Sequence, residues 1–187
     1  MELRQPDPTT CGSCCAVRTR MLLDQGYDAW VRADPSGARF RSEALAAHRR
    51  TNRAVAAGGA LLPWPAALGT QPWALARELA GVSGTRHEVR WVLPWRRDTA
   101  YDLVRGVVGA GQPVPVYVGS ALLPRHVVLA LRADAYADAL TVYDPAAGSD
   151  VRAARADWLG GRLGLSGWQL PWAVVVPVSP AARRTPA

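Results

Sequence analysis

Residues 5–26 read QPDPTTCGSCCAVRTRMLLDQG, and this stretch decides the fold of the first half of the chain. The two threonines before the first cysteine are typical N-cap residues, and the apolar positions after them recur near helical spacing. Gly26 is a typical helix stop. We therefore predict a helix over about 11–25 that begins at a cysteine.

Three more helices are predicted farther along the chain from their start and stop signals. The first covers about 41–57 and precedes two glycines. The second covers 72–80, because Pro72 suits a first helical position and Gly81 would stop the helix. The third covers about 98–111.

Short runs rich in β-branched and aromatic residues dominate the second half, bounded by Gly, Pro and Asp as strands usually are. HEVRWV (87–92) is an earlier candidate strand. The later runs are PVPVYVG (113–119), HVVLALR (126–132), ALTVYD (139–144) and WAVVVPV (172–178). A helical half followed by a strand-rich half predicts an α+β fold rather than an alternating α/β fold.

We expect one domain over 1–179, with a helical lobe over about 1–112 packed on an antiparallel sheet lobe over about 113–179. The last residues, 180–187, have little apolar content and are expected to form a flexible tail. A domain of this size can bury a core without disulfide bonds.

The composition excludes several classes of protein. No stretch reaches the length of a membrane span, and no secretory signal opens the chain, so we expect a cytoplasmic protein unless a dedicated secretion system exports it. The net charge is +7, but all 22 basic residues are arginines, and they are scattered. We therefore do not expect nucleic acid as a partner.

Three cysteines lie within five residues, at positions 11, 14 and 15, so they cannot link distant parts of the fold. A helix N-terminus beside a histidine lowers the pKa of a thiol, and Cys11 occupies such a terminus. The first N–H groups of that helix, including the Cys11 amide, have no acceptor within the helix. They can therefore donate hydrogen bonds to the oxyanion that forms when a thiolate attacks a carbonyl group. Gln5, six residues earlier, is the candidate second donor.

His126 opens one predicted strand, and Asp144 closes the next. In an antiparallel pair these two positions lie at the same edge. The carboxylate can then accept a hydrogen bond from one ring nitrogen of the histidine, and the other nitrogen faces the thiol.

The combination of a glutamine, five residues, Cys-Gly at a helix start and a later strand-borne histidine followed by Asp-Pro resembles the papain-like cysteine peptidase superfamily. The likeness is greatest to peptidases that remove double-glycine leaders from bacteriocins. It implies a papain-like fold, Cys11 as nucleophile, His126 as base and Asp144 as its orienting residue. It also implies Gln5 and the Cys11 amide as oxyanion donors, a peptide or protein substrate, and no cofactor.

The register of the nucleophile has an alternative. CGSC also resembles the papain signature C-G-S-C-W, in which the second cysteine attacks, and that register selects Cys14. The glutamine spacing, the threonine cap and the Cys-Gly pair favour Cys11. Cys14 and Cys15 then pack one helix face. A redox pair is less favoured because no strand precedes the motif, and no metal is expected because no second ligand pair exists.

Other functions use the same residues. A papain-like acyltransferase or transpeptidase would pass the thioester to an amine, and a delivered antibacterial or host-directed protease effector would cut a foreign protein. A non-catalytic peptide-binding module would keep the fold without turnover.

With no exporter segment attached, we do not expect leader-peptide processing itself. Trp64, Trp73 and Trp95 are predicted to line a substrate groove.

Overall fold

The computed structural model describes residues 2–56, 69–134 and 136–178. Helices come first along the chain, and most strands follow. The helices are α1 (Cys11–Leu23), α2 (Gln25–Arg32), α3 (Ala38–Ala56), α4 (Pro72–Ser83), the 3-10 helix η2 (Pro94–Arg96), α5 (Arg97–Gly109) and α6 (Arg155–Gly160). The strands are β1 (His87–Trp91), β2 (Val114–Gly119), β3 (Pro124–Ala133), β4 (Ala139–Asp144), β5 (Ser149–Ala154) and β6 (Leu170–Pro177).

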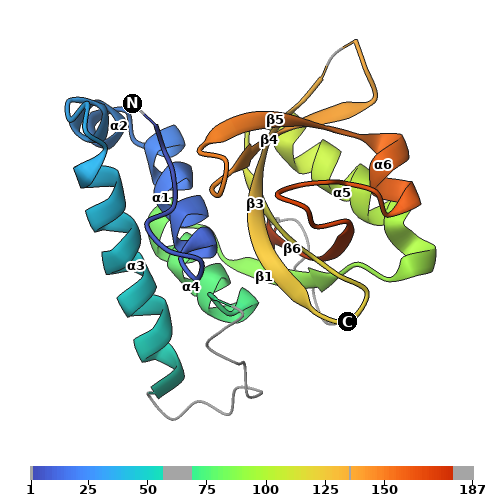
Figure 1. Cartoon of the computed structure of the whole chain (residues 1–187), viewed down its shortest axis with the longest axis horizontal. Helices are drawn as coiled ribbons and strands as arrows, with labels where there is room; N and C mark the ends of the chain where they lie inside the picture. The colour runs from blue at the N-terminus through green and yellow to red at the C-terminus, as the bar shows by residue number, and fades with distance from the viewer. Residues whose placement is uncertain (1, 57–68, 135, 179–187) are drawn as a thin grey trace, which may run out of the picture.

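The described strands form one six-stranded sheet in the order β1-β6-β2-β3-β4-β5. Every neighbouring pair in that order is antiparallel. Helices α1, α3 and α4 pack together on one side of the sheet, and α5 and α6 lie on the other (Figure 1). The predicted α+β fold, with the helix that begins at Cys11 packed on an antiparallel sheet, is confirmed.

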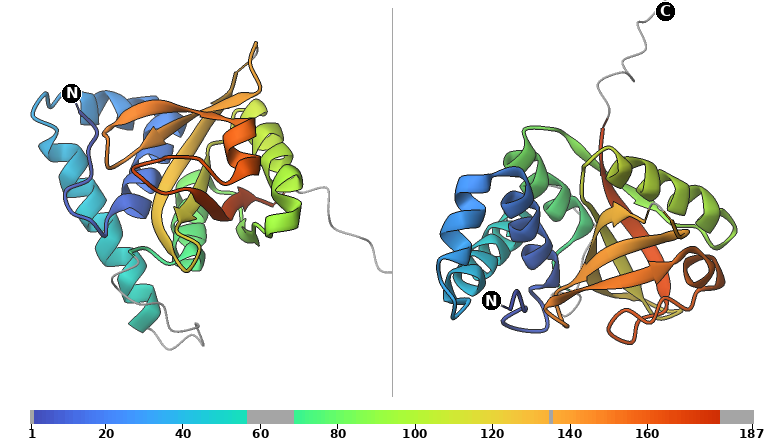
Figure 2. Two further views of the ribbon diagram at one scale, coloured as in Figure 1. Left: turned by 45° about the vertical axis from the view of Figure 1, so that its right-hand side comes forward. Right: turned by 90° about the horizontal axis from the view of Figure 1, so that it is seen from above.

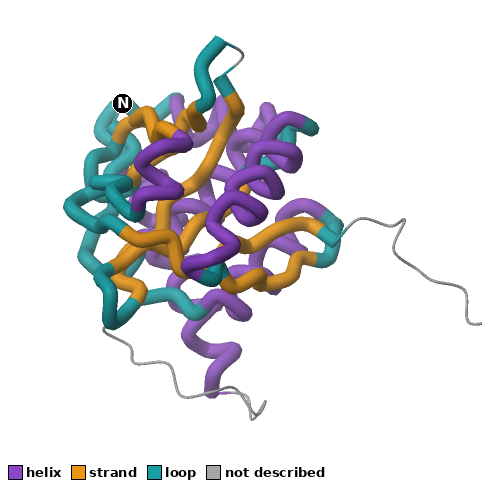
Figure 3. The backbone as a smooth tube through the Cα atoms, turned by 90° about the vertical axis from the view of Figure 1, so that its right-hand side faces the viewer, coloured by secondary structure: helices purple, strands orange, loops and turns teal. Residues whose placement is uncertain are grey.

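The two faces of the sheet carry separate hydrophobic cores. Because successive residues of a strand point to opposite faces, Val127 and Leu129 enter the core on the α1 side, whereas Val128 and Ala130 enter the core under α5. Figure 2 shows the helices around the sheet from two further directions, and Figure 3 shows α5 in front of the strands. None of the helices in the described part of the chain is long and apolar enough to span a membrane.

The sheet begins earlier in the sequence than the strand-rich second half. β1 pairs with β6 at one edge of the sheet, and α5 packs against β3 and β6. The expected lobe boundary near residue 112 lies after both of these elements. The expected tail, 180–187, lies outside the described residues.

Two helix boundaries differ from the prediction. Gly26 does not end the first helix; α1 stops at Leu23, and Gly26 lies in α2, which we did not predict. Asp24 causes this break, because its extended backbone ends α1 and its side chain accepts a hydrogen bond from the Tyr27 amide at 2.9 Å, capping α2. The second difference is at the end of α4. This helix continues through Gly81 and ends at Gly84, whose φ of 69° suits a left-handed C-cap.

Two further elements of the second half, β5 and α6, were not predicted at all, and neither was the one-turn helix η2. β5 has the sequence SDVRAA and lies at the sheet edge with mostly polar or small side chains, so it carries no hydrophobic alternation. The helix α6 has only six residues and contains a single buried one, Trp158. Both elements are held by their neighbours rather than by a strong local pattern.

The first turn of α1 packs so closely that large side chains do not fit. Residues 11–15 are all buried, and a Cβ added to Gly12 would lie 2.8 Å from the Cβ of Thr70. Thr70 also lies 3.3 Å from the hydroxyl of Ser13, and its carbonyl accepts a hydrogen bond from Tyr117 at 2.9 Å. The segment before α4 therefore links the start of α1 to the sheet.

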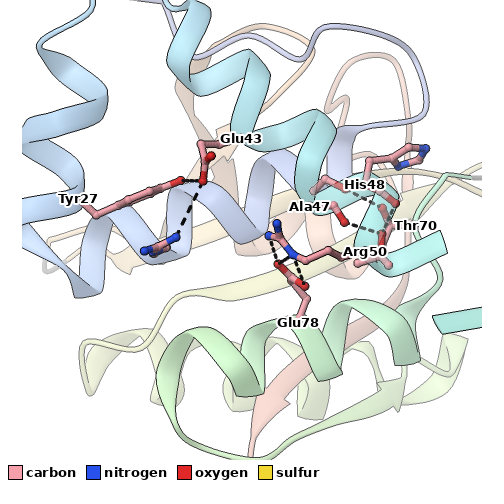
Figure 4. A network of polar contacts seen from close by, with 10 residues as sticks. Tyr27, Glu43, Ala47, His48, Arg50, Thr70 and Glu78 are labelled. Atoms are coloured by element: carbon pink, nitrogen blue, oxygen red, sulfur yellow. Dashed lines mark hydrogen bonds and ion pairs between the residues drawn. The ribbon is translucent and has the colours of Figure 1, made fainter. Parts of the chain in front are cut away.

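Polar contacts join the helices at the outer side of this lobe (Figure 4). Tyr27 of α2 donates to Glu43 of α3 at 2.7 Å, and Arg20 of α1 lies 3.9 Å from the same carboxylate. Arg50 of α3 donates to Glu78 of α4 at 3.1 Å. Because such partly exposed ion pairs contribute only about 0–1 kcal/mol each, the apolar core is the main source of stability.

Two matched glycine substitutions test the packing of α1. Gly12→Ala should lower the free energy of unfolding by about 1–3 kcal/mol, because the added methyl group meets the Thr70 side chain. Gly81→Ala should raise it by about 0.5–1 kcal/mol, because alanine favours the helix and nothing lies within 4 Å of the added methyl group in the last turn of α4. Urea unfolding measures both, and a neutral Gly12→Ala would contradict the close contact.

Candidate functional site

His126 and Asp144 come together where β3 and β4 meet. His126 lies near the start of β3, opposite Val118 of β2, and Asp144 ends β4. The Nε2 atom of His126 lies 2.8 Å from Oδ1 of Asp144. A carboxylate only accepts hydrogen bonds, so the imidazole donates. Both side chains are buried, with 5% and 2% of their surface exposed.

Cys11 approaches the same imidazole from α1. Burial lowers the pKa of His126, but hydrogen bonds with Asp144 and Cys11 outweigh burial and raise the pKa to about 9. For Asp144 the directions are reversed: burial raises its pKa, but hydrogen bonds from His126, Ser166 and the Ala146 amide outweigh burial and lower the pKa overall. The histidine therefore carries a proton at neutral pH, and the aspartate is ionised.

The other two cysteines are in different surroundings. Burial raises the pKa of both Cys14 and Cys15 well above that of an ordinary thiol, so both stay protonated at neutral pH. The thiol of Cys15 donates to the carbonyl of Val127 at 3.6 Å, and both side chains belong to the core under α1. All three cysteines are free thiols. Of the three, Cys11 is the one whose side chain bonds to His126.

The N-terminal segment runs beside the end of β4. The amide of Gln5 donates to the carbonyl of Pro145 at 2.9 Å, and the hydroxyl of Tyr143 donates to the carbonyl of Leu3. This places Gln5 next to the residue that follows Asp144. The Oε1 atom of Gln5 is buried and has no hydrogen-bond partner among the described residues.

One residue of the site was missed by the sequence analysis. The hydroxyl of Ser166 donates to Oδ2 of Asp144 at 2.7 Å, while the amide of Ala146 donates to Oδ1 at 3.0 Å. The sequence signal was only the Ser-Gly pair in GRLGLSG, which is typical of a turn. A turn signal gives no information about which distant side chain the turn approaches.

Two of the three predicted groove tryptophans belong to the described residues, and these two lie in different places. Trp64 lies outside the described residues. The ring of Trp73 in α4 lies edge to face with that of Trp91, with 6.1 Å between centroids, and Trp95 is 75% exposed. A groove of about 640 Å³ lies between β1, β6 and α5, and neither Trp73 nor Trp95 is among the residues that line it. Their role at a substrate groove stays a prediction.

Among the described residues no group of three His, Cys, Asp or Glu side chains is arranged to hold a metal ion.

Comparison with known proteins gives a structural likeness and no sequence match. No family model matches the chain, and no curated protein matches it. Among solved structures, the chain is similar to the peptidase domain of Streptococcus ComA, a bi-functional ABC transporter involved in a quorum sensing pathway. The sequence identity is 16% and the TM-score 0.48, over 94% of this chain and 96% of that one.

The raised pKa of His126 predicts how stability varies with pH. Folding stabilises the charged imidazole, so this contribution is fully present below the unfolded pKa of about 6.5 and is lost as the pH rises towards about 9. The free energy of unfolding should therefore fall by about 2 kcal/mol between pH 6 and pH 8. Urea unfolding at a series of pH values measures this fall.

Two variants assign the effect to the buried pair. Asp144→Asn removes the charge beside His126 and should remove most of the fall. His87→Gln should leave the fall in place, because His87 lies at the start of β1 and burial lowers its pKa. If wild type and Asp144→Asn showed the same pH dependence, the ion pair would not be its source.

Proposed function

We propose that the chain is a cysteine peptidase that hydrolyses peptide bonds through a thioester, with Cys11 as nucleophile and His126 and Asp144 as its partners. One observation carries the proposal: a buried imidazole bonds to a carboxylate at 2.8 Å, and its pKa is raised further by a side-chain hydrogen bond with a cysteine at a helix N-terminus. This is the arrangement that an activated thiol requires.

The positive charges around Cys11 favour attack by its sulfur. The protonated His126 ring and the positive end of the 13-residue helix α1 both stabilise a thiolate. The thiolate attacks the carbonyl carbon of the substrate and forms an S–C bond. One electron pair of the C=O double bond moves to the oxygen, which becomes an oxyanion. The Cys11 amide is the first N–H of α1 and has no acceptor within the helix, so it is a candidate donor to that oxygen.

Proton transfer by His126 completes both halves of the reaction. The imidazolium gives its proton to the leaving amine as the C–N bond breaks, which leaves a thioester on Cys11. The neutral imidazole then takes a proton from water, which attacks the thioester and releases the carboxylic acid and the thiolate. Asp144 keeps the ring oriented and stabilises its charged form.

Selective alkylation tests the nucleophile. At pH 6, iodoacetamide should modify Cys11 in preference to Cys14 and Cys15, because burial keeps those two thiols protonated. Replacing His126 by alanine should slow the reaction about 10-fold or more, because the thiolate loses its counter-charge. Mass spectrometry of digested protein identifies the site, and the small reagent suits a side chain that is 1% exposed.

Two controls sharpen the alkylation experiment. Cys14→Ser should leave the modification of Cys11 in place, and His48→Ala should leave its rate unchanged because that histidine is on α3 and bonds to Asn52. Modification of Cys14 would move the nucleophile to the other register. Equal, slow modification of all three cysteines would contradict the peptidase and favour a binding module.

A second variant tests the oxyanion donors. Gln5→Ala should slow hydrolysis of a peptide substrate about 100-fold, because one stabilising donor is lost when the oxyanion forms. The same variant should keep a near wild-type rate of alkylation by iodoacetamide, because that reaction forms no oxyanion. Loss in both assays to the same degree would instead show that Gln5 supports the position of Cys11 or His126.

A further inference from the structure

The chain between α6 and β6 folds into a small hairpin of its own. The amide of Leu165 donates to the carbonyl of Trp168 at 3.1 Å, and the amide of Trp168 donates back at 2.9 Å. Ser166 and Gly167 form the two-residue turn between them, with φ values of 46° and 85°. Positive φ at both central positions is the geometry of a type I′ turn.

The identity of the first turn residue is unusual for that geometry. Asparagine, aspartate and glycine are the residues that tolerate such a position, and among the described residues Ser166 is the one non-glycine with a positive φ. Strained backbone of this kind persists when the surrounding structure holds it, and it gathers at functional sites. The side chain of Ser166 must therefore contribute something that glycine would not.

The contribution is a hydrogen bond to Asp144. Oδ1 of Asp144 already accepts from His126 Nε2 and from the Ala146 amide, and Ser166 donates to Oδ2 at 2.7 Å. Donors on both oxygens fix the rotation of the carboxylate as well as its position. The lone pair of Oδ1 then points at the histidine without depending on the histidine bond alone.

The hairpin is well held in front of Asp144. Leu163 and Leu165 are buried in the core under α5, and the amide of Gln169 donates to the carbonyl of Gly119 at 3.2 Å. Gly119 ends β2, beside the start of β3 where His126 lies. The Ser166 hydroxyl is therefore attached to the same part of the sheet as the histidine that it influences.

We propose that Ser166 is a positioning residue, which holds the Asp144 carboxylate in the orientation that bonds His126. Its effect on the reaction rests on the proposed function, but its effect on Asp144 and His126 does not. Among the described residues, the ionisable groups whose charges interact with Asp144 are His126 on β3, Cys15 on α1 and its own neighbour Tyr143 on β4.

Two substitutions separate the hydroxyl from the turn. Glycine and asparagine both suit a positive φ, so Ser166→Gly and Ser166→Asn should keep the hairpin. Ser166→Gly lacks a donor, whereas the amide of Ser166→Asn can donate to the carboxylate. Gln169→Ala is the matched control, because it removes an exposed side-chain bond within the same turn and leaves Asp144 untouched.

Nuclear magnetic resonance titration of the Asp144 carboxyl and the His126 ring is the first measurement. Ser166 helps to lower the pKa of Asp144, so Ser166→Gly should raise that pKa, and protonation of Asp144 should perturb the His126 ring at a correspondingly higher pH. Ser166→Asn and Gln169→Ala should titrate as wild type. The other two histidines serve as internal references.

The rate of Cys11 alkylation at pH 6 is the second measurement. Ser166→Gly should slow it about 5- to 30-fold, and Ser166→Asn should recover most of the loss. An unchanged titration in Ser166→Gly would overturn the proposal. Where Cys11 of the wild type is selectively alkylated, a changed titration with an unchanged alkylation rate would overturn it too. If Ser166→Gly changed the titration but Cys11 of the wild type were not selectively alkylated, the positioning of Asp144 would hold and the proposed peptidase would fail.

Discussion

The buried hydrogen bond between His126 and Asp144 is the interaction on which the arrangement of the site depends. Removing two charges from water costs several kcal/mol per ion, so such a pair is tolerated only when its remaining hydrogen-bonding capacity is satisfied. Here the carboxylate accepts from His126, Ala146 and Ser166, and the imidazole also bonds to Cys11. These four groups come from four parts of the chain, so the complete arrangement requires the sheet, α1 and the last hairpin to be packed together.

The position of α1 is set by a second constraint, the size of its side chains. A helix surrounded by α3, α4 and β3 can approach them closely only with small residues, and its first turn reads CGSCC. Gly12 is one example, because a Cβ added there would lie 2.8 Å from the Cβ of Thr70. Close packing of this turn brings the sulfur of Cys11 to the imidazole of His126, which approaches from the sheet. The residues around Cys11 are therefore shaped as much by packing as by chemistry.

The sequence predicted the elements whose information is local. Proline at the start of α4, the cysteine-led start of α1 and the β-branched content of β2, β3, β4 and β6 are signals read within a few residues. The paired positions of His126 and Asp144 followed from strand polarity alone. The cap by Asp24 that starts α2 is also a local signal, and the sequence analysis overlooked it. β5 and α6 have no strong local signal, because β5 depends on pairing at the sheet edge and α6 has only one buried residue.

Ser166 shows why the last part of the site was beyond sequence reasoning. In the sequence it is one polar residue in a glycine-rich turn, 22 positions from Asp144. Two structural facts give it meaning: the turn has a backbone that disfavours serine, and its hydroxyl meets the free oxygen of the buried carboxylate. At this position the backbone conformation is unfavourable for serine, and the hydrogen bond to Asp144 offsets that cost. Local and global requirements usually agree in a natural sequence, so a position where they conflict points to a residue retained for its contact.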